Sequence, residues 1–371
     1  MKITSVDVWK VVVPTIPGTV HSPAFGPAGW DQVPKFIIRL NTDDGLSGIG
    51  ETHRGVLRSA VEAGIERVVG LDPLKLSLQY LPLNPPRPDV TYPGRDWEIG
   101  GGTGVGNPAH DAFEMAFFDL VGKALGVPAH FLLGGAFRTR VKADFWIGQQ
   151  TAEDAARNVR QGKARGFGGV KMKCAIDDPW IERIGAIVEA AGPDFRITID
   201  PNERFYRPHE AIALARQLAR FPSVEVYEDP VPKWNLDWYR QIRAAVDVPI
   251  ALHLGNPHDI ANAIKAEACD CMNLGGGMVQ FVRNAAMAEG AGLACWHGSG
   301  NDLGIMEHSY LQAAAAARNC VLASDFVGSW TREDDLTVEP IQFEAGHALV
   351  PDRPGLGCDL DDSALEKYQV P

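Results

Sequence analysis

The chain from about residue 141 onward repeats one pattern, in which a short apolar run is followed by an amphipathic helical segment. The runs recur every 20–30 residues or so, roughly the length of one strand–helix unit, and they are rich in β-branched side chains. Eight such units are typical of a (β/α)8 barrel, so we expect an α/β protein built on a TIM-type barrel. The alternative is a doubly wound open sheet, but no early strand is followed by the Gly-rich turn of that fold. The eight runs are VKADFWI, GGVKMK, FRITID, VEVYED, VPIALH, CDCMNL, GLACWH and CVLASDF.

Residues 1–130 lack this pattern and predict a separate α+β part. The segments KITSVDVWKVVVP and KFIIRLNTDDGLSGIGET are typical of antiparallel strands, and the helix HDAFEMAFFDLVGKALG follows later. Two long stretches rich in Gly and Pro interrupt this part, and such loops are uncommon unless they have a function. The first contains His21 and Trp30, and the second contains Arg95-Asp96-Trp97. We therefore expect lid loops that close over a binding site.

The charge balance limits the partners that this chain can have. It has 35 basic and 47 acidic residues, a formal net charge of −12, and no basic run, which makes nucleic acid and anionic membranes poor partners. No apolar stretch approaches the roughly 18 residues of a membrane-spanning helix. The six cysteines are scattered without C-x-x-C spacing, as expected for buried thiols in the cytoplasm. An acidic protein that binds an anionic substrate must supply positive charge locally, through lysine or a metal ion.

Polar side chains stand at or just beyond the ends of consecutive predicted strands. Barrel enzymes build their sites at these carboxyl ends, whereas the strands themselves are otherwise apolar. A single residue of this kind could be a helix cap or an ion-pair partner, but caps alone do not explain the series. The residues are Lys171, Lys173, Asp200, Asn202, Glu228, Asp229, His253, Asn273 and His297.

Three of these residues predict a metal site. Asp200, Glu228 and His253 end three successive strands, so their side chains can converge on one ion. Two carboxylates and an imidazole suit Mn²⁺, Fe²⁺, Zn²⁺ or Co²⁺ and tolerate Mg²⁺. Such an ion would bind a substrate carboxylate and stabilise the enediolate that forms when the α-proton leaves.

The two lysines and the last histidine are candidates for proton transfer. Lys171 and Lys173 lie two residues apart and therefore on one face of a strand. Positive charges held close together lower each other's pKa, which would allow one lysine to act as a base. The alternative is a lysine pair that only balances the carboxylates. His297, five strands further on, would lie across the pocket as a second acid or base, or else serve as a core or substrate-orienting histidine.

The motifs GVKMK, ITIDPN, VYEDP and VPIALH, in this order, resemble the enolase superfamily over nearly the whole chain. The resemblance is to the mandelate racemase and muconate lactonising family, nearest to its glucarate dehydratase branch. It implies a modified (β/α)8 barrel over residues 131–330. It also implies an α+β capping domain over residues 1–130 that is completed by the C-terminal segment 331–371. One divalent metal ion, Mg²⁺ before Mn²⁺ or another transition metal, is implied as the cofactor.

Carried over by position, the resemblance assigns a role to each motif residue. Lys173 of the K-x-K motif becomes the base, with Lys171 beside it. Asp200 and Glu228 become metal ligands, and Asn202 of the D-x-N motif becomes a substrate-binding residue. His297 becomes the histidine that the racemase and dehydratase branches place after the seventh strand.

Two positions depart from the family pattern. The third ligand is usually Asp, Glu or Asn, whereas this chain has His253, with Asn256 as the second choice. An aspartate normally follows the sixth strand and raises the basicity of the histidine, whereas this chain has Asn273. An amide can orient His297 but cannot stabilise an imidazolium by charge.

The favoured prediction is a sugar-acid dehydratase acting on a small carboxylate. A racemase or epimerase of a 2-hydroxy acid is the second possibility, and a retired barrel that binds a metal without turnover is the third. Trp296 is expected to form a pocket wall, and His21 and Trp30 are expected to close over the substrate. The resemblance also suggests a homo-oligomer, either a dimer or an octamer.

Overall fold

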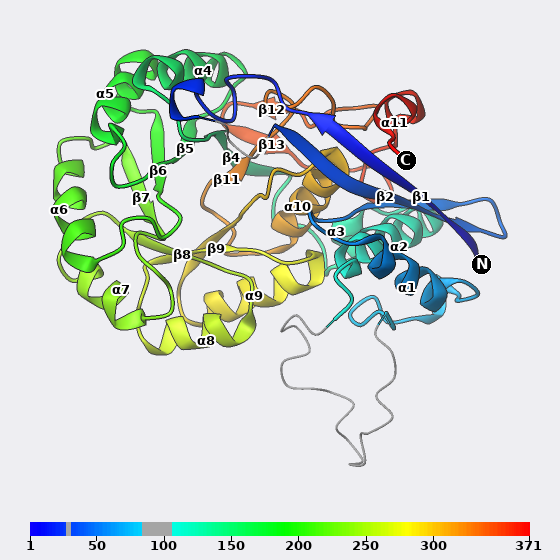
Figure 1. Cartoon of the computed structure of the whole chain (residues 1–371). Helices are drawn as coiled ribbons and strands as arrows, with labels where there is room; N and C mark the ends of the chain where they lie inside the picture. The colour runs from blue at the N-terminus through cyan, green and yellow to red at the C-terminus, as the bar shows by residue number, and fades with distance from the viewer. Residues whose placement is uncertain (27–30, 84–105) are drawn as a thin grey trace.

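The computed structural model of the chain describes residues 1–26, 31–83 and 106–371. A parallel sheet curls into a barrel that helices surround, and a smaller sheet lies at its side (Figure 1). The barrel strands neighbour one another in chain order from β4 to β10, and β11 pairs with β4. These strands are β4 (Arg140–Ile147), β5 (Gly169–Lys173), β6 (Arg196–Asp200), β7 (Val224–Glu228), β8 (Ile250–Leu254), β9 (Cys271–Leu274), β10 (Ala294–His297) and β11 (Ser324–Phe326).

The segment before β11 closes the ring against β10. Cys295 and Cys320 form a parallel bridge, and the amide of Leu322 donates to the carbonyl oxygen of Cys295 at 3.3 Å. Each of the eight predicted runs overlaps one barrel strand. The expected α/β barrel is therefore confirmed.

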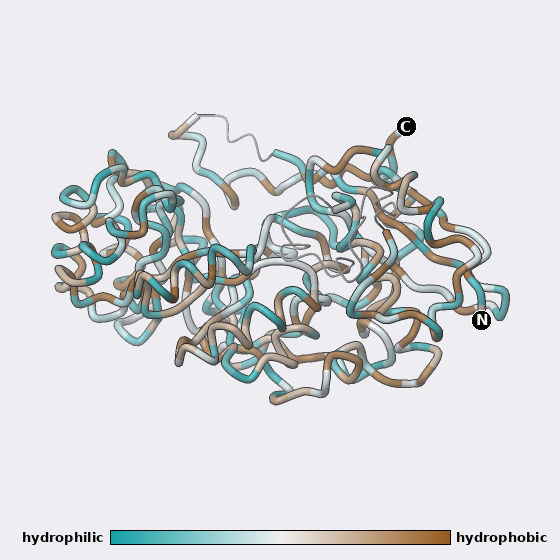
Figure 2. The backbone as a smooth tube through the Cα atoms, turned by 90° about the horizontal axis from the view of Figure 1, so that it is seen from below, coloured by the Kyte–Doolittle hydropathy of each residue, from teal (hydrophilic) through white to brown (hydrophobic). Residues whose placement is uncertain are grey.

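Helices cover the outside of the barrel because each has one apolar face. Figure 2 shows hydrophilic and hydrophobic residues alternating along these outer coils. Side-chain caps mark the start of three of them, α4, α7 and α8; in α4 the side chain of Thr151 accepts from the amide of Asp154 at 3.2 Å. The helices are α4 (Ala152–Ala164), α5 (Trp180–Ala191), α6 (Pro208–Leu218), α7 (Leu236–Arg243), α8 (Pro257–Lys265), α9 (Met278–Gly290) and α10 (Gly304–Ala316).

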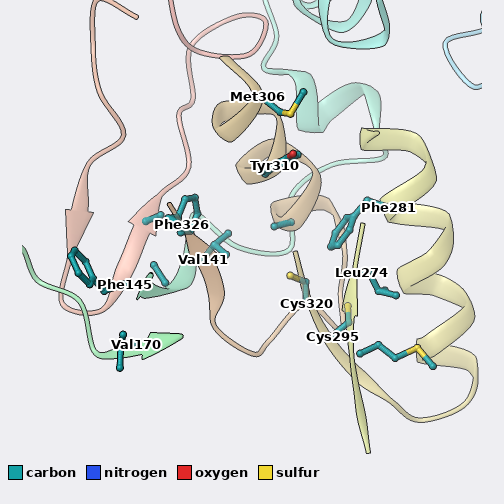
Figure 3. Close-up of a cluster of buried hydrophobic side chains, with 14 of the residues drawn as sticks. Val141, Phe145, Val170, Leu274, Phe281, Cys295, Met306, Tyr310, Cys320 and Phe326 are labelled. Carbon is teal, nitrogen blue, oxygen red and sulfur yellow. The ribbon is translucent and has the colours of Figure 1, made fainter. Parts of the chain in front are cut away.

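Helix α10 differs from the others because it is buried on all sides. It lies between the barrel wall and the N-terminal part, and its run of alanines allows close packing (Figure 1). Figure 3 shows the apolar layer that fills this region, including Tyr310 on α10, Phe281 on α9, and Leu274 and Cys295 on the strands. This layer determines what surrounds the end of β10.

The N-terminal part is a three-stranded antiparallel sheet in the order β1-β2-β3, packed against helices. Gly48 and Gly50 of β3 allow α2 to approach closely, since a Cβ at these positions would lie 2.1 and 1.9 Å from the backbone oxygens of Ala116 and Ala112. The elements are β1 (Ile3–Pro14), β2 (Gln32–Thr42), β3 (Ser47–Glu51), α1 (Arg58–Val68), α2 (His110–Leu125) and α3 (Ala129–Leu132), with short 3₁₀ turns at Pro23–Phe25 and Pro73–Lys75.

The C-terminal segment contacts both parts of the molecule. It contains β12 (Phe343–Glu344), β13 (His347–Leu349) and α11 (Asp362–Tyr368). Strand β13 pairs antiparallel with β4 of the barrel, and the amide of Val370, just after α11, donates to the carbonyl oxygen of Lys10 in β1 at 2.8 Å. None of the described helices has the length and apolar character to cross a membrane.

Candidate active site

The polar side chains predicted at the strand ends gather on the inner face of the barrel. Successive side chains of a strand point to opposite faces, so every second residue faces the barrel axis. The intervening residues, such as Met172 and Ile199, lie in the hydrophobic core. The inner residues near the carboxyl ends contact one another through hydrogen bonds and ion pairs. They are Lys171, Lys173, Asp200, Glu228, His253, Asn273, Trp296 and Asp325.

Lys171 is at the centre of this group. Its Nζ lies 3.1 Å from Oδ2 of Asp200, 2.9 Å from Oε2 of Glu228 and 3.4 Å from Oδ1 of Asp325. Burial alone would lower the pKa of Lys171, but the three carboxylates outweigh burial and raise the pKa well above its ordinary value. Lys171 is therefore a buried cation and not a neutral base. The sequence predicts a lowered lysine pKa from the neighbouring positive charges, but the pKa of Lys171 is raised.

Lys173 lies closer to the mouth of the barrel and is more accessible. It is in register with Asp200 across β5 and β6, and its Nζ contacts Oδ2 of Asp200. Its side chain is 16% exposed, compared with 3% for Lys171. Lys173 is therefore the lysine that a molecule entering the barrel mouth can reach.

The two carboxylates predicted to bind a metal have different electrostatic surroundings. Burial would raise the pKa of Asp200, but Lys173 and Lys171 together hold it below its usual range. Burial and the charge of Asp200 raise the pKa of Glu228 to about 8. The Glu228 carboxylate is thus only partly compensated by Lys171, and a further positive charge beside it would be favourable.

His253 and Asp229 lie next to Glu228. One possible ligand atom from each of these three residues lies within 4.8 Å of the others. The His253 side chain is 35% exposed, but the surrounding protein removes much of the water from its ring. This loss of solvation and the charge of Lys171 lower the pKa of His253 to about 3, so the imidazole is neutral. Asp229 is already engaged, because its Oδ2 lies 2.5 Å from Nζ of Lys233 and its Oδ1 accepts from the amide of His253 at 3.0 Å.

These residues fit a divalent cation. When ionised, Asp200, Glu228 and Asp325 carry three negative charges, against one positive charge on Lys171 and one on Lys173 when it is protonated, so one or two negative charges remain. Carboxylate oxygens with one neutral imidazole form a donor set that suits Mn²⁺ and related ions and tolerates Mg²⁺. The predicted ligands Glu228 and His253 lie in one cluster. The third predicted ligand, Asp200, contacts Lys171, which also contacts Glu228. Asp229 lies in the cluster but is tied to Lys233.

The three predicted asparagines have different surroundings. Asn273 faces the barrel axis, and its Nδ2 donates to Oε1 of Glu228 at 2.8 Å. Asn202 is exposed beyond β6, with a left-handed φ of 47°. Its backbone amide donates to Oδ1 of Asp200 at 2.9 Å. Asn256, the second choice for the third ligand, is the N-cap of α8 and accepts from the amide of His258 at 2.8 Å.

His297 does not lie across the pocket from Lys173. Its neighbour Trp296 faces the barrel axis, so His297 points outward, where its ring stacks on Tyr310 at 4.0 Å between centroids and lies 4.3 Å from Phe281. Nδ1–H donates to the carbonyl oxygen of Gly298 at 2.7 Å. Burial lowers the pKa of His297 to about 4 and keeps the ring neutral. The structure therefore brings the predicted pocket wall Trp296 into the site and leaves His297 outside it.

The predicted lid residues are only partly described. His21 lies 5.9 Å from Phe25 between ring centroids, and its Nε2 is buried without a hydrogen-bond partner in the described structure. Trp30 and Arg95-Asp96-Trp97 lie outside the described residues. The lid role of these loops stays a prediction.

Two residues of the site were not predicted from the sequence. Asp325 on β11 faces the barrel axis, where its Oδ1 accepts from Nε1 of Trp296 at 3.1 Å. A charge inside the apolar run CVLASDF was the available signal, because a buried strand rarely carries one without a partner. Lys233 follows Asp229 by four residues in a loop and gave no pattern that could be recognised.

Comparisons with known proteins identify the family of this chain. The family described as enolase C-terminal domain-like matches residues 152–364. The chain is 28% identical to a chloromuconate cycloisomerase of Cupriavidus pinatubonensis over 93% of each chain, and 27% identical to an arabinonate dehydratase of Saccharolobus solfataricus over 92% of each chain.

The fold is also similar to that of a solved structure. The crystal structure of an N-succinyl Arg/Lys racemase from Bacillus cereus superposes with a TM-score of 0.84 at 21% identity, covering 100% of this chain and 98% of that one. The fold, the matched family and these relatives together show that the chain belongs to the enolase superfamily, in its mandelate racemase and muconate lactonising family.

Proposed function

We propose that this enzyme removes the α-proton of a small carboxylate substrate with the help of a divalent metal ion, and that the overall reaction is the dehydration of a sugar acid. The observation that carries the proposal is the charge of the inner face. Asp200, Glu228 and Asp325 are buried around Lys171, with Lys173 beside Asp200, and the excess negative charge of the three ionised carboxylates equals the charge of one divalent ion when Lys173 is neutral.

The metal would be held by Asp200, Glu228 and His253. When bound, such an ion supplies positive charge that makes the α-proton of a carboxylate acidic enough for a side-chain base. Mg²⁺ is the first choice and Mn²⁺ the second, because His253 adds a nitrogen ligand to an otherwise oxygen-based set.

Lys173 would take the proton. It is the more exposed of the two lysines and lies beside Asp200, at the edge of the metal site. Lys171 would stay charged and fix the positions of Glu228 and Asp325, whose carboxylates it contacts. This division of roles follows from burial, since a base must reach the substrate whereas a structural cation need not.

Dehydration of a sugar acid is favoured by the uncharged polar groups near the strand ends. Asn202 follows β6, and Ser299 follows β10 with its Oγ donating to Oδ2 of Asp325 at 2.9 Å. Amides and hydroxyls of this kind suit the hydroxyl groups of a sugar acid. The similarity to an arabinonate dehydratase is consistent with this choice of substrate.

The test is proton NMR of the protein in D₂O with sugar acids of four to six carbons, after chelation and after addition of Mg²⁺ or Mn²⁺. We expect a 2-keto-3-deoxy product with metal and none without it. The variant Lys173→Met should still bind Mn²⁺ by calorimetry but lose the product. Metal binding without α-proton exchange in the unaltered protein would favour a barrel that binds metal but has no catalytic activity. Exchange without a keto product would exclude dehydration of these acids.

A further inference from the structure

The proton-transfer groups of the site are distributed unevenly around the barrel. In a ring of eight strands, the strand opposite β5 is β9, four positions away in either direction. Strand β5 carries Lys171 and Lys173, whereas the inner residue at the end of β9 is Asn273. The two faces of a substrate held on the barrel axis would therefore meet different chemistry.

Asn273 cannot exchange a proton and is fixed in place. Its Nδ2 donates to Oε1 of Glu228 at 2.8 Å, and the same oxygen lies 3.0 Å from Nζ of Lys171. Its Oδ1 is buried against Gly298, where a Cβ would lie 2.3 Å away. The amide thus packs closely against the backbone of Gly298, and it is neutral in every orientation.

The strands beside β9 do not supply the missing acid. On β10 the inner residue is Trp296, whose indole donates to Asp325 at 3.1 Å. The ring of His297 lies on the other side of the strand between Phe281 and Tyr310, and the residue is 3% exposed. This ring therefore does not point toward the barrel axis.

His253 and Asp325 also face the axis at the carboxyl ends of described strands, and both are already engaged. His253 on β8 lies beside Glu228, where it belongs to the proposed ligand set. Asp325 on β11 contacts Lys171 and Trp296 through Oδ1 and Ser299 through Oδ2. Neither is a free acid or base opposite β5.

We infer that Lys173 is the only group among the described residues that handles the substrate's α-proton, so that the reaction takes place on one face of the α-carbon. This inference rests on the proposed function and extends it to the class of reaction. A racemase needs a second acid on the opposite face. With the proton-transfer groups of residues 1–26, 31–83 and 106–371, the enzyme would act on one configuration at the α-carbon without inverting it.

Dehydration on a single face can be written with Lys173 alone. The C2–H bond breaks as the proton moves to Nζ of neutral Lys173, and its electron pair forms the C2–C3 double bond. The C3–O bond breaks with its own electron pair, and the proton on Lys173 passes to the departing hydroxyl, giving water. The remaining enol becomes the 2-keto-3-deoxy acid in solution, and Lys173 is returned neutral.

The experiment uses the full chain with Mn²⁺ in D₂O. The probes are the separate 2R and 2S forms of 2-hydroxy acids of four to six carbons that lack the 3-hydroxyl group and so cannot be dehydrated. We expect deuterium to enter the α-position of one form with its configuration retained, as seen by NMR and chiral chromatography. Deuterated product of inverted configuration would overturn the single-face inference and leave proton abstraction standing. No exchange with any acid, although Mn²⁺ binds, would overturn the proposed function and this inference with it.

Matched variants assign the proton transfer. Lys173→Met should lower the exchange rate by about 10³-fold, within the range for loss of a general base. His297→Phe, which can keep the ring stack, should exchange at the rate of the unaltered protein, and His297→Gln provides a second test if the first variant does not fold. A folded His297 variant with a large loss of exchange would show that a second group takes part and would overturn the inference.

Discussion

Trp296 and His297 are neighbours in β10 whose side chains lie on opposite sides of the barrel wall. The indole of Trp296 reaches Asp325 on the barrel axis, whereas the imidazole of His297 stacks on Tyr310 in the layer below α10. The order of these two residues determines which of them can meet a substrate, because a strand cannot turn two successive side chains inward.

The first prediction concerns the pH dependence of folding. Burial lowers the pKa of His297 from 6.5 to about 4, although its bond to Gly298 and the charges of Asp325 and Asp302 oppose this shift. As the pH falls, the unfolded chain therefore binds a proton at His297 before the folded chain does. The contribution of neutral His297 to the free energy of unfolding is fully present above pH 6.5 and is lost as the pH falls through about 4. The loss amounts to about 3 kcal/mol, at 1.36 kcal/mol for each pKa unit.

Urea unfolding between pH 7 and pH 4 measures this effect. His297→Phe should have a shallower loss of stability on acidification than the unaltered protein. His347→Gln, at a histidine of β13 that is not buried, should follow the unaltered protein. Parallel pH curves for all three proteins would contradict the assignment.

The placement of His297 also shows where prediction from the sequence ends. The apolar runs gave all eight barrel strands, because buried parallel strands are short and rich in β-branched residues. The polar strand ends gave Lys173, Asp200, Glu228 and Asn273, which the structure brings to one axis. They did not give the side of the strand on which a terminal residue lies, since that depends on pairing with neighbouring strands.

Asp325 is a second example of this limit. Its significance depends on Lys171, which is 154 positions away in the chain and 3.4 Å away in space. No local spacing rule links residues so far apart. The third metal ligand is uncertain from the sequence for the same reason, because Asp229 is tied up by Lys233 only in the folded chain.

The second prediction compares the two site lysines in the absence of metal. Lys171→Met would leave three buried carboxylates without their shared cation and should destabilise the chain by about 3–5 kcal/mol. Lys173→Met removes one contact to Asp200, which keeps Lys171 and the Asn202 amide, so it should cost only about 1–2 kcal/mol. Denaturant unfolding in EDTA tests the order, and equal losses would contradict it.

The third prediction concerns the contact between the N-terminal sheet and the barrel. Lys35 of β2 is fully buried, with its Nζ 3.0 Å from Glu51 and 2.7 Å from Asp302, and Glu51 also accepts from the amide of Leu303 at 2.7 Å. Lys35→Met should therefore cost about 3–5 kcal/mol, as expected for a broken buried ion pair. Lys142→Met, at an exposed lysine of β4, should change stability by less than about 0.5 kcal/mol. Thermal melts of both variants make the comparison.

The fourth prediction concerns the choice of metal. If His253 is a ligand, His253→Asp gives an all-oxygen set and should bind Mn²⁺ and Co²⁺ less well relative to Mg²⁺ than the unaltered protein does. Asn256→Asp is the matched control, since aspartate also caps a helix and should preserve the start of α8. Calorimetric titration with each ion decides between the two positions. A changed affinity in Asn256→Asp with none in His253→Asp would make Asn256 the ligand.

The last prediction tests whether Asn273 supports Glu228. A Cβ on Gly298 would lie 2.3 Å from Oδ1 of Asn273, so Gly298→Ala must push this amide away and weaken its 2.8 Å bond to Glu228. Loss of a partner that orients a metal ligand typically weakens binding by about 10–100-fold, and we expect a weakening of that size for Mn²⁺.

Gly255→Ala is the control for this prediction. Gly255 also follows a barrel strand, but a Cβ there would have its nearest neighbour at 3.7 Å, an ordinary contact. Its Mn²⁺ affinity should equal that of the unaltered protein in the same titration. If Gly298→Ala binds Mn²⁺ equally well, the amide of Asn273 does not hold Glu228 in position, and its place opposite Lys173 would then serve only to keep that face of the site free of acid.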